Sequence, residues 1–223
     1  MENILEFQNV TYAYNTKSQK VNILDNTSYT FKKGTIYAIV GPSGTGKTTT
    51  MVLAGGLDSP KDGKIIFKDQ ELKKIGYNNY RCNDISIVFQ SYNLIYYMNA
   101  LENVENALNI AKKKIPNKKE YCMSILEKLG LSKDECKRDI RRLSGGQQQR
   151  VAIARSIAKD VDLILADEPT GNLDEKNSQD ILDIFLDLAH KEGKCVIIVT
   201  HSPDLARQCD EQLKLKDGKI VKI

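Results

Sequence analysis

The chain has 223 residues, of which 41% are hydrophobic and 28% are charged. These proportions are ordinary for a soluble globular protein and exclude fibrous and disordered classes. The net charge of +4 comes mostly from lysines spread along the chain, with a denser run at residues 112–119. Because no aromatic side chains interleave with this run, it is typical of a solvated surface and no nucleic acid is expected as a partner.

Cysteine usage and the chain start indicate the compartment. Five cysteines stand at irregular spacings without a C-x-x-C pair, which predicts a reducing compartment with neither a disulfide framework nor a zinc site. The first residues lack the basic and apolar regions of a signal peptide. The apolar runs are far shorter than the roughly 20 residues that span a bilayer. A cytoplasmic polypeptide is therefore expected, with any membrane work done through a partner.

The first thirty or so residues show an alternation of apolar and polar side chains. Apolar side chains alternate with polar ones at Leu5 and Phe7, and again at Val10, Tyr12 and Tyr14. This period of two is typical of strands with one face on a core. The pattern predicts antiparallel strands at this end of the chain.

Four later apolar runs lack alternation and are rich in β-branched residues: Thr35–Val40, Ile85–Gln90, Val161–Asp167 and Cys195–Thr200. Such runs are typical of parallel strands that are buried on both faces. Before the last run, apolar residues recur at helical spacing and predict an amphipathic helix: Ile181, Ile184, Phe185 and Leu188. Alternating strands and helices predict an α/β fold with a mainly parallel core sheet.

Turns and a helical stretch complete the organisation. Asp62-Gly63 and Asp217-Gly218 are typical of turn centres. The stretch from about Ser91 to Ile140 is mainly helical and, with the helix after it, predicts an inserted helical subdomain at about residues 91–158. No linker or repeat divides the chain, so residues 1–223 are expected to form a single domain.

Residues 41–48 fit the pattern G-x-x-x-x-G-K-[ST] and lie between a predicted strand and a predicted helix. The glycines let successive backbone N–H groups face a phosphate chain, and the helix adds its positive N-terminal end. Lys47 would meet the β- and γ-phosphates, and the Thr48 hydroxyl would reach Mg²⁺. The expected nucleotide-binding residues are Gly41, Pro42, Ser43, Gly44, Thr45, Gly46, Lys47, Thr48 and Thr49.

Two carboxylates follow the third apolar run. Asp167 ends this strand and would hold the magnesium shell through water. Glu168 is expected to point the other way along the strand, where it would act as base on the attacking water. An apolar run that ends in Asp-Glu is common, so the pair alone does not indicate a catalytic site. Together with the predicted phosphate-binding loop, it is the expected pair of carboxylates.

Residues 143–150 read LSGGQQQR and continue as VAIARSIA. Ser144 stands just before this helix, so its hydroxyl, the glycine N–H groups and the helix dipole form a second anion site. Ser144 with Gln147 also fits a capping box, and both roles can hold together. One chain already has a phosphate cradle, so a second anion-binding helix end implies two facing chains.

With this motif the sequence resembles the ABC ATPases along nearly its full length, and the family's motifs occur in the family's order. The matching residues are 41–48 for Walker A, Gln90 for the Q-loop, Ser144, Gly145, Gly146 and Gln147 for the signature, Asp167 and Glu168 for Walker B and the catalytic glutamate, Asn172–Asp174 for the D-loop, and His201 for the switch histidine. The resemblance implies a P-loop NTPase fold of ABC type and an ATPase activity that uses ATP and Mg²⁺.

The resemblance also assigns partners and roles. It implies a head-to-tail homodimer in which ATP lies between the cradle of one subunit and the signature of the other. Glu168, His201 and Gln90 would be catalytic, Thr48, Gln90 and Asp167 would serve the metal, and Asp174 would belong to the D-loop. Tyr14 would stack on adenine, with Tyr12 as the neighbouring candidate.

Three segments resemble one branch of the family: FQSYNLI, ALENV and LADEPTGNLD. This branch drives macrolide efflux, lipoprotein release and cell-division complexes through a separate integral membrane subunit. We therefore expect a subunit attached peripherally to the inner face of the membrane, and export or mechanical work. The chain departs from the branch at Ile95–Met98, where a proline-containing turn is expected.

Three other functions fit the sequence less well. Soluble ABC ATPases that act on nucleic acid or ribosomes carry coiled-coil insertions or tandem ATPase domains, and this chain has neither. A regulatory module that only holds ATP is disfavoured by Glu168 and His201. A GTPase is disfavoured because Asn117–Glu120 only approximates the guanine-reading motif and lies away from any predicted strand end.

Overall fold

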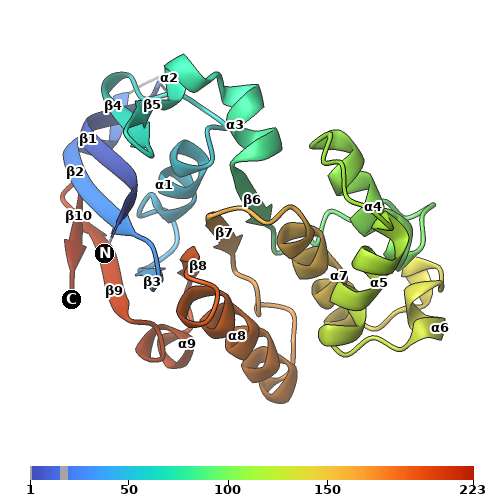
Figure 1. Cartoon of the computed structure of the whole chain (residues 1–223). Helices are drawn as coiled ribbons and strands as arrows, with labels where there is room; N and C mark the ends of the chain where they lie inside the picture. The colour runs from blue at the N-terminus through green and yellow to red at the C-terminus, as the bar shows by residue number, and fades with distance from the viewer. Residues whose placement is uncertain (1, 16–19) are drawn as a thin grey trace.

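The computed structural model describes residues 2–15 and 20–223, which form two sheets and the helices around them (Figure 1). The core sheet has the strand order β10-β9-β3-β8-β7-β6. Its strands are β3 (Thr35–Val40), β6 (Ile85–Val88), β7 (Leu163–Asp167), β8 (Cys195–Thr200), β9 (Glu211–Lys216) and β10 (Lys219–Lys222). All neighbours pair in parallel except β9 and β10. The mainly parallel core sheet is confirmed, and β6 and β7 are each two residues shorter than expected.

The second sheet has the order β2-β1-β4-β5 and is antiparallel. Its strands are β1 (Asn3–Asn15), β2 (Lys20–Lys32), β4 (Asp62–Phe67) and β5 (Gln70–Glu71). The prediction of antiparallel strands at the start of the chain is therefore confirmed.

Helices cover both faces of the core sheet (Figure 1). Their bounds are α1 (Lys47–Ala54), α2 (Leu72–Ile75), α3 (Tyr77–Asn83), α4 (Ala100–Ile110), α5 (Lys118–Lys128), α6 (Lys133–Cys136), α7 (Gly145–Ala158), α8 (Glu175–His190) and α9 (Pro203–Arg207), with a 3₁₀ turn at Ile140–Arg142. The segment between β6 and β7 carries α4 to α7, and α4, α5 and α6 gather at one end of the molecule, away from β1 and β2. None of the helices in the described ranges is long and apolar enough to cross a bilayer.

Two apolar clusters hold these layers together. One lies between the two sheets and around α1, and it includes Phe7, Met51 and Leu165. The other lies beneath α7 and α8 on the opposite face, and it includes Val151 and Phe185. The helical stripe expected in α8 is buried as predicted, except that Ile184 packs at the edge of the cluster.

The parallel register brings three strand ends together. Val40 pairs with Thr200, and Asp167 pairs with Val199. The carboxyl ends of β3, β7 and β8 therefore lie side by side, which is the edge where ligands bind in open α/β sheets. The loops after these strands carry the site.

The two predicted turns have different outcomes. Asp217-Gly218 joins β9 to β10, as expected. The prediction for Asp62-Gly63 is wrong, because these residues begin β4 and the turn after that strand is Lys68-Asp69. Gly63 lies at a register shift in the β1–β4 pairing, with φ 77°, and a Cβ there would lie 2.2 Å from the Asn9 carbonyl oxygen. The glycine thus serves a strand irregularity.

Gly63→Ala is expected to lower the free energy of unfolding by about 2–4 kcal/mol, because it adds a backbone clash to an unfavourable φ. Gly193→Ala is the matched control: its φ is 69° and nothing lies within 4 Å of the added Cβ, so about 1 kcal/mol is expected there. Urea unfolding of both variants measures the difference. Equal losses would contradict the role of the Asn9 contact.

Candidate functional site

The loop at residues 41–48 joins β3 to α1. Gly46 stands before α1 with φ 101°, and a Cβ there would lie 2.4 Å from the Ile23 side chain, so only glycine fits. Lys47 is 8% exposed, and its ammonium donates to the carbonyl oxygens of Gly41 at 2.6 Å and Pro42 at 2.9 Å. The loop is thus curled around a buried cation at the N-terminus of a helix.

A cavity of about 360 Å³ opens beside this loop. It is lined by Tyr14, Ile23, Ser43, Gly44, Gly46, Lys47, Thr48, Thr49, Gln90, Asp167, Glu168 and Val199. Three predicted groups therefore meet in one place: the loop, the Q-loop glutamine and the two carboxylates. Gly41, Pro42 and Thr45 belong to the loop but do not line the cavity.

Glu168 is oriented by a turn. β7 ends at Asp167, and Glu168 has φ 45° while its N–H donates to the Val199 carbonyl at 2.9 Å. The expectation that the two carboxylates point in opposite directions along a strand is wrong, since the strand stops between them and both line the cavity. Strand alternation does not apply beyond the last strand residue.

The Glu168 carboxylate is held from one side. Its Oε1 lies 2.8 Å from His201 Nδ1, and its Oε2 accepts from the Thr200 hydroxyl and the His201 N–H, both at 3.3 Å. The carboxylate is largely buried, and the His201 side chain is 71% exposed. His201 lines a neighbouring cavity that also includes Glu168. A carboxylate that is fixed in this way can accept a proton from a water in the cavity.

Asp167 lies deeper at the end of β7. Burial raises its pKa, the adjacent Glu168 charge adds to this, and Lys47 opposes it. None of the described lysines and arginines forms an ion pair with Asp167. A partly buried carboxylate with no ion-pair partner among the described lysines and arginines lines the same cavity as the exposed Thr48, and together their oxygens suit a hard divalent ion.

Asp167→Asn is expected to raise the Tm of the nucleotide-free chain at pH 7 by about 2–4 °C, the shift that about 1 kcal/mol gives at this length. Folding raises the pKa of Asp167 above 3.8, so the folded chain favours the protonated carboxyl. The stabilisation from the protonated carboxyl is full below pH 3.8 and is lost as pH rises through the folded pKa. The gain should therefore vanish near pH 3. Thermal scans from pH 3 to 8 measure it, and no gain at pH 7 would contradict the burial argument.

The segment after Glu168 contacts the Q-loop. The Asn172 amide nitrogen donates to the Gln90 carbonyl at 3.3 Å, and a Cβ on Gly171 would lie 3.1 Å from the Gln90 amide nitrogen. Asp174 caps α8 by accepting from the Asn177 N–H at 2.9 Å. Asp174 does not line the cavity.

The signature residues occupy the start of α7. Ser144 caps this helix, with its hydroxyl accepting from the Gln147 N–H at 3.3 Å and the Gln147 side chain accepting from the Ser144 N–H at 2.9 Å. The Gln147 amide also donates to Glu135 at 2.6 Å. Residues 144–147 do not line the cavity that holds Lys47 and Glu168. A single chain therefore presents two separate helix ends that suit anions.

The two candidate tyrosines occupy different environments. Tyr12 is 3% exposed and donates to Asp58 at 2.5 Å, which places it in the core. Tyr14 is 46% exposed, lines the cavity and has its hydroxyl 3.4 Å from that of Thr49. Only Tyr14 offers a ring face next to the loop.

Sequence reasoning missed three residues of this site. Ile23 lies on β2 and packs against Gly46, and nothing in the local pattern of β2 points to the loop. Val199 and Thr200 end β8 and contact Glu168 through its N–H and its carboxylate. Their place directly before His201 is the signal that could have indicated them.

Comparisons with known proteins agree on one family. The model of the ABC transporter family matches residues 24–171. The chain is 49% identical to the ABC transporter ATP-binding protein YclH of Bacillus subtilis strain 168, over 98% of this chain and 96% of YclH. It is 38% identical to the macrolide export ATP-binding/permease protein MacB of Hyphomonas neptunium, over 98% of this chain and 34% of MacB.

Solved structures give the same result. The dimeric structure of MJ0796, a bacterial ABC transporter cassette, superposes with a TM-score of 0.88 at 34% identity, over 97% of this chain and 96% of that one. A post-hydrolysis dimer of MJ0796 bound to ADP and Pi superposes with a TM-score of 0.89 at 33% identity, over 99% and 98% of the two chains.

Proposed function

This chain belongs to the ATP-binding proteins of the ABC transporter family, and we propose that it is the ATP-hydrolysing subunit that drives a separate integral membrane subunit. The chain binds and hydrolyses ATP as a family member. The observation that carries the proposal is the meeting of Lys47, Asp167 and the His201-held Glu168 around one cavity. Family membership accounts for ATP hydrolysis. The coupling of this hydrolysis to a separate membrane subunit is the proposal.

The cavity fits a magnesium nucleotide. The curled loop and the N-terminus of α1 suit the phosphate chain, and the exposed ring of Tyr14 suits a base. The oxygens of Thr48 and Asp167 suit Mg²⁺, which when bound would neutralise charge on the phosphates. No group of three or more His, Cys, Asp or Glu in the described ranges could hold a metal alone.

Each residue has a chemical role in hydrolysis. Lys47 exchanges its two backbone carbonyls for phosphate oxygens. Glu168 accepts the proton of the attacking water, and His201 fixes the carboxylate through the contact between its Nδ1 and the Glu168 Oε1. Gln90 lines the same cavity, where its side-chain amide would help to hold Mg²⁺ and to orient the attacking water. The residues thus position the nucleotide and the attacking water, and Glu168 takes the proton of that water. Positioning is a main contribution of the protein to phosphoryl transfer.

Two chains are needed to complete the site. Residues 144–147 lie at a helix end outside the cavity, so in the proposed assembly they meet the nucleotide held by a partner chain. The dimeric structures of MJ0796 support this arrangement. Closure on two nucleotides and reopening after phosphate release would then transmit force, in export, lipoprotein release or mechanical work.

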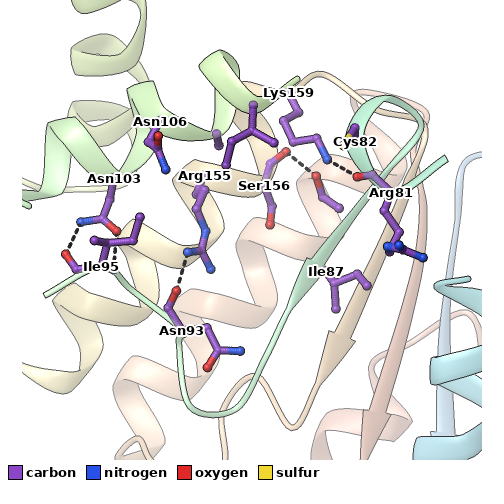
Figure 2. Close-up of a pocket in the computed structure, with 13 residues that line it drawn as sticks. Arg81, Cys82, Ile87, Asn93, Ile95, Asn103, Asn106, Arg155, Ser156 and Lys159 are labelled. Carbon is purple, nitrogen blue, oxygen red and sulfur yellow. Dashed lines mark hydrogen bonds between the residues drawn. The ribbon is translucent and has the colours of Figure 1, made fainter. Parts of the chain in front are cut away.

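A groove suits the membrane partner. A cavity of about 450 Å³ lies between β6, α4, α7 and the loop after β6 (Figure 2). Arg155 donates to the Asn93 and Tyr92 carbonyls, and Lys159 donates to those of Arg81 and Ile85.

The groove carries two cations whose donors bind backbone carbonyls, Arg155 and Lys159. Burial lowers the pKa of Lys159 to about 8, and the Asp84 carboxylate partly opposes this shift. A cytoplasmic segment of the membrane subunit that presents a carboxylate would add negative charge next to these cations. Ile110, which is exposed and lines the cavity, offers apolar contact there.

Co-purification from native membranes tests the proposal. The tagged chain should recover a polytopic membrane protein, identified by mass spectrometry, that stimulates its ATPase activity on reconstitution. Ile110→Asp, at an exposed position on the groove, should abolish recovery of the membrane protein and keep basal ATPase activity. Lys214→Glu, at an exposed position on β9, should recover the membrane protein as the wild-type chain does. Recovery of ribosomes or nucleic acid, with nucleotide-stimulated turnover, would overturn the membrane assignment.

A further inference from the structure

Gln149 is a buried polar residue that the mechanism above does not use. It lies on α7 and is 0% exposed. Its amide nitrogen donates to the Pro169 carbonyl at 2.7 Å, and its amide oxygen has no hydrogen-bond partner among the described residues. An unpaired buried oxygen of this kind costs about 1–3 kcal/mol. Among the described residues, the hydrogen bond to the Pro169 carbonyl is the one that this side chain makes.

That carbonyl belongs to the turn that carries Glu168. Pro169 directly follows Glu168, whose φ is 45°, and the Gly171 N–H closes the turn on the Glu168 carbonyl at 3.0 Å. Other contacts hold the turn from the side of β8 and of Gln90. Gln149 holds it from the side of α7. The backbone position of the proposed base therefore depends on this helix.

The same helix begins with the signature. Ser144 caps α7, and Gln149 lies about one turn and a half further on. A helix moves as a rigid unit over so short a distance, so a shift of residues 144–147 reaches Pro169 through the Gln149 side chain. In the assembly proposed above, the signature contacts the nucleotide of the partner, while Glu168 serves the nucleotide of its own chain.

We propose that Gln149 is a positioning residue that ties the Glu168 turn to the signature helix, so that engagement of the partner's nucleotide aligns the base for the chain's own nucleotide. The inference rests on the proposed dimer. In this proposal, the hydrogen bond from Gln149 to the Pro169 carbonyl links the two ATP sites.

Gln149→Met keeps the side-chain volume and removes the donor. It should lower kcat for ATP hydrolysis by about 10-fold or more, since a small misplacement of a catalytic group has effects of this size, with KM within about 2-fold of wild type. Gln148→Met is the matched control, because Gln148 donates within its own segment to the Leu143 carbonyl at 3.0 Å. It should keep wild-type kcat.

A nucleotide-free readout separates positioning from unfolding. In Gln149→Met, amide hydrogen exchange at residues 168–174 should accelerate, and exchange within α7 should stay as in wild type. Gln149→Asn is the second variant if Gln149→Met does not fold, because its buried amide falls one methylene short of the Pro169 carbonyl. It should show the same lower kcat and the same faster exchange at residues 168–174.

Mixed dimers give the decisive result. In a dimer of one wild-type chain and one Glu168→Gln chain, a single site turns over. Gln149→Met in the chain with Glu168 should slow that site, and Gln149→Met in the other chain, whose signature serves that site, should have a much smaller effect. Equal effects in the two chains, or wild-type kcat in Gln149→Met, would overturn the inference. Failure of wild type to hydrolyse ATP, or of Glu168→Gln to dimerise with ATP, would instead overturn the proposed function.

Discussion

Replacing Glu168 with glutamine is expected to lower kcat for ATP hydrolysis by about 10²–10⁴-fold, the contribution typical of a positioned general base. The amide has nearly the same shape and keeps a partner in His201, which lies 2.8 Å from the carboxylate in the wild-type chain. Nucleotide binding should therefore persist. Because reopening follows hydrolysis, the variant should accumulate as an ATP-loaded dimer.

Size-exclusion chromatography with light scattering, together with a phosphate-release assay, measures both effects. Glu192→Gln, an exposed position after α8, is the matched control and should remain monomeric and active after ATP is consumed. A Glu168→Gln chain that turns over at the wild-type rate would show that another group accepts the proton.

Replacing Lys47 with alanine is expected to weaken ATP binding by about 10–100-fold, since a hydrogen bond to a charged group contributes about 1.5–3 kcal/mol. Among the described residues that line the cavity, Lys47 is the only lysine or arginine, so none of them replaces its charge. Calorimetric titration with ATP and Mg²⁺ measures the loss.

Lys47 also donates to two carbonyls of its own loop, so the Tm of the variant must be recorded beside the affinity. Lys64→Ala, at an exposed position on β4, is the control and should bind as wild type. Unchanged affinity in a folded Lys47→Ala chain would contradict the assignment of the loop as the phosphate cradle.

Much of the core was predictable because its signals are local. The runs at Thr35–Val40 and Cys195–Thr200 became β3 and β8 with the expected bounds, since a strand buried on both faces needs an unbroken apolar run. The loop at residues 41–48 was equally clear, because its glycines and lysine stand at a spacing set by the backbone that curls around a phosphate.

Features that depend on distant partners were not predictable. Gly63 looked like a turn residue, but its φ serves a strand irregularity that only the β1–β4 pairing reveals. The direction of the Glu168 side chain depends on where β7 ends and on contacts with Thr200 and His201 from another strand. Ile23 lies on β2 and contacts Gly46 only because the two sheets pack together. The sequence around Ile23 does not indicate that contact.

The structure of the Glu168→Gln chain with ATP and Mg²⁺ would decide the central claim, which is that each nucleotide is enclosed by two copies of the protein. The expected result is a twofold assembly in which the Ser144 hydroxyl of one copy lies within hydrogen-bond distance of the γ-phosphate bound by Lys47 of the other. A nucleotide contacted by only one copy, with both Ser144 residues facing solvent, would contradict the account.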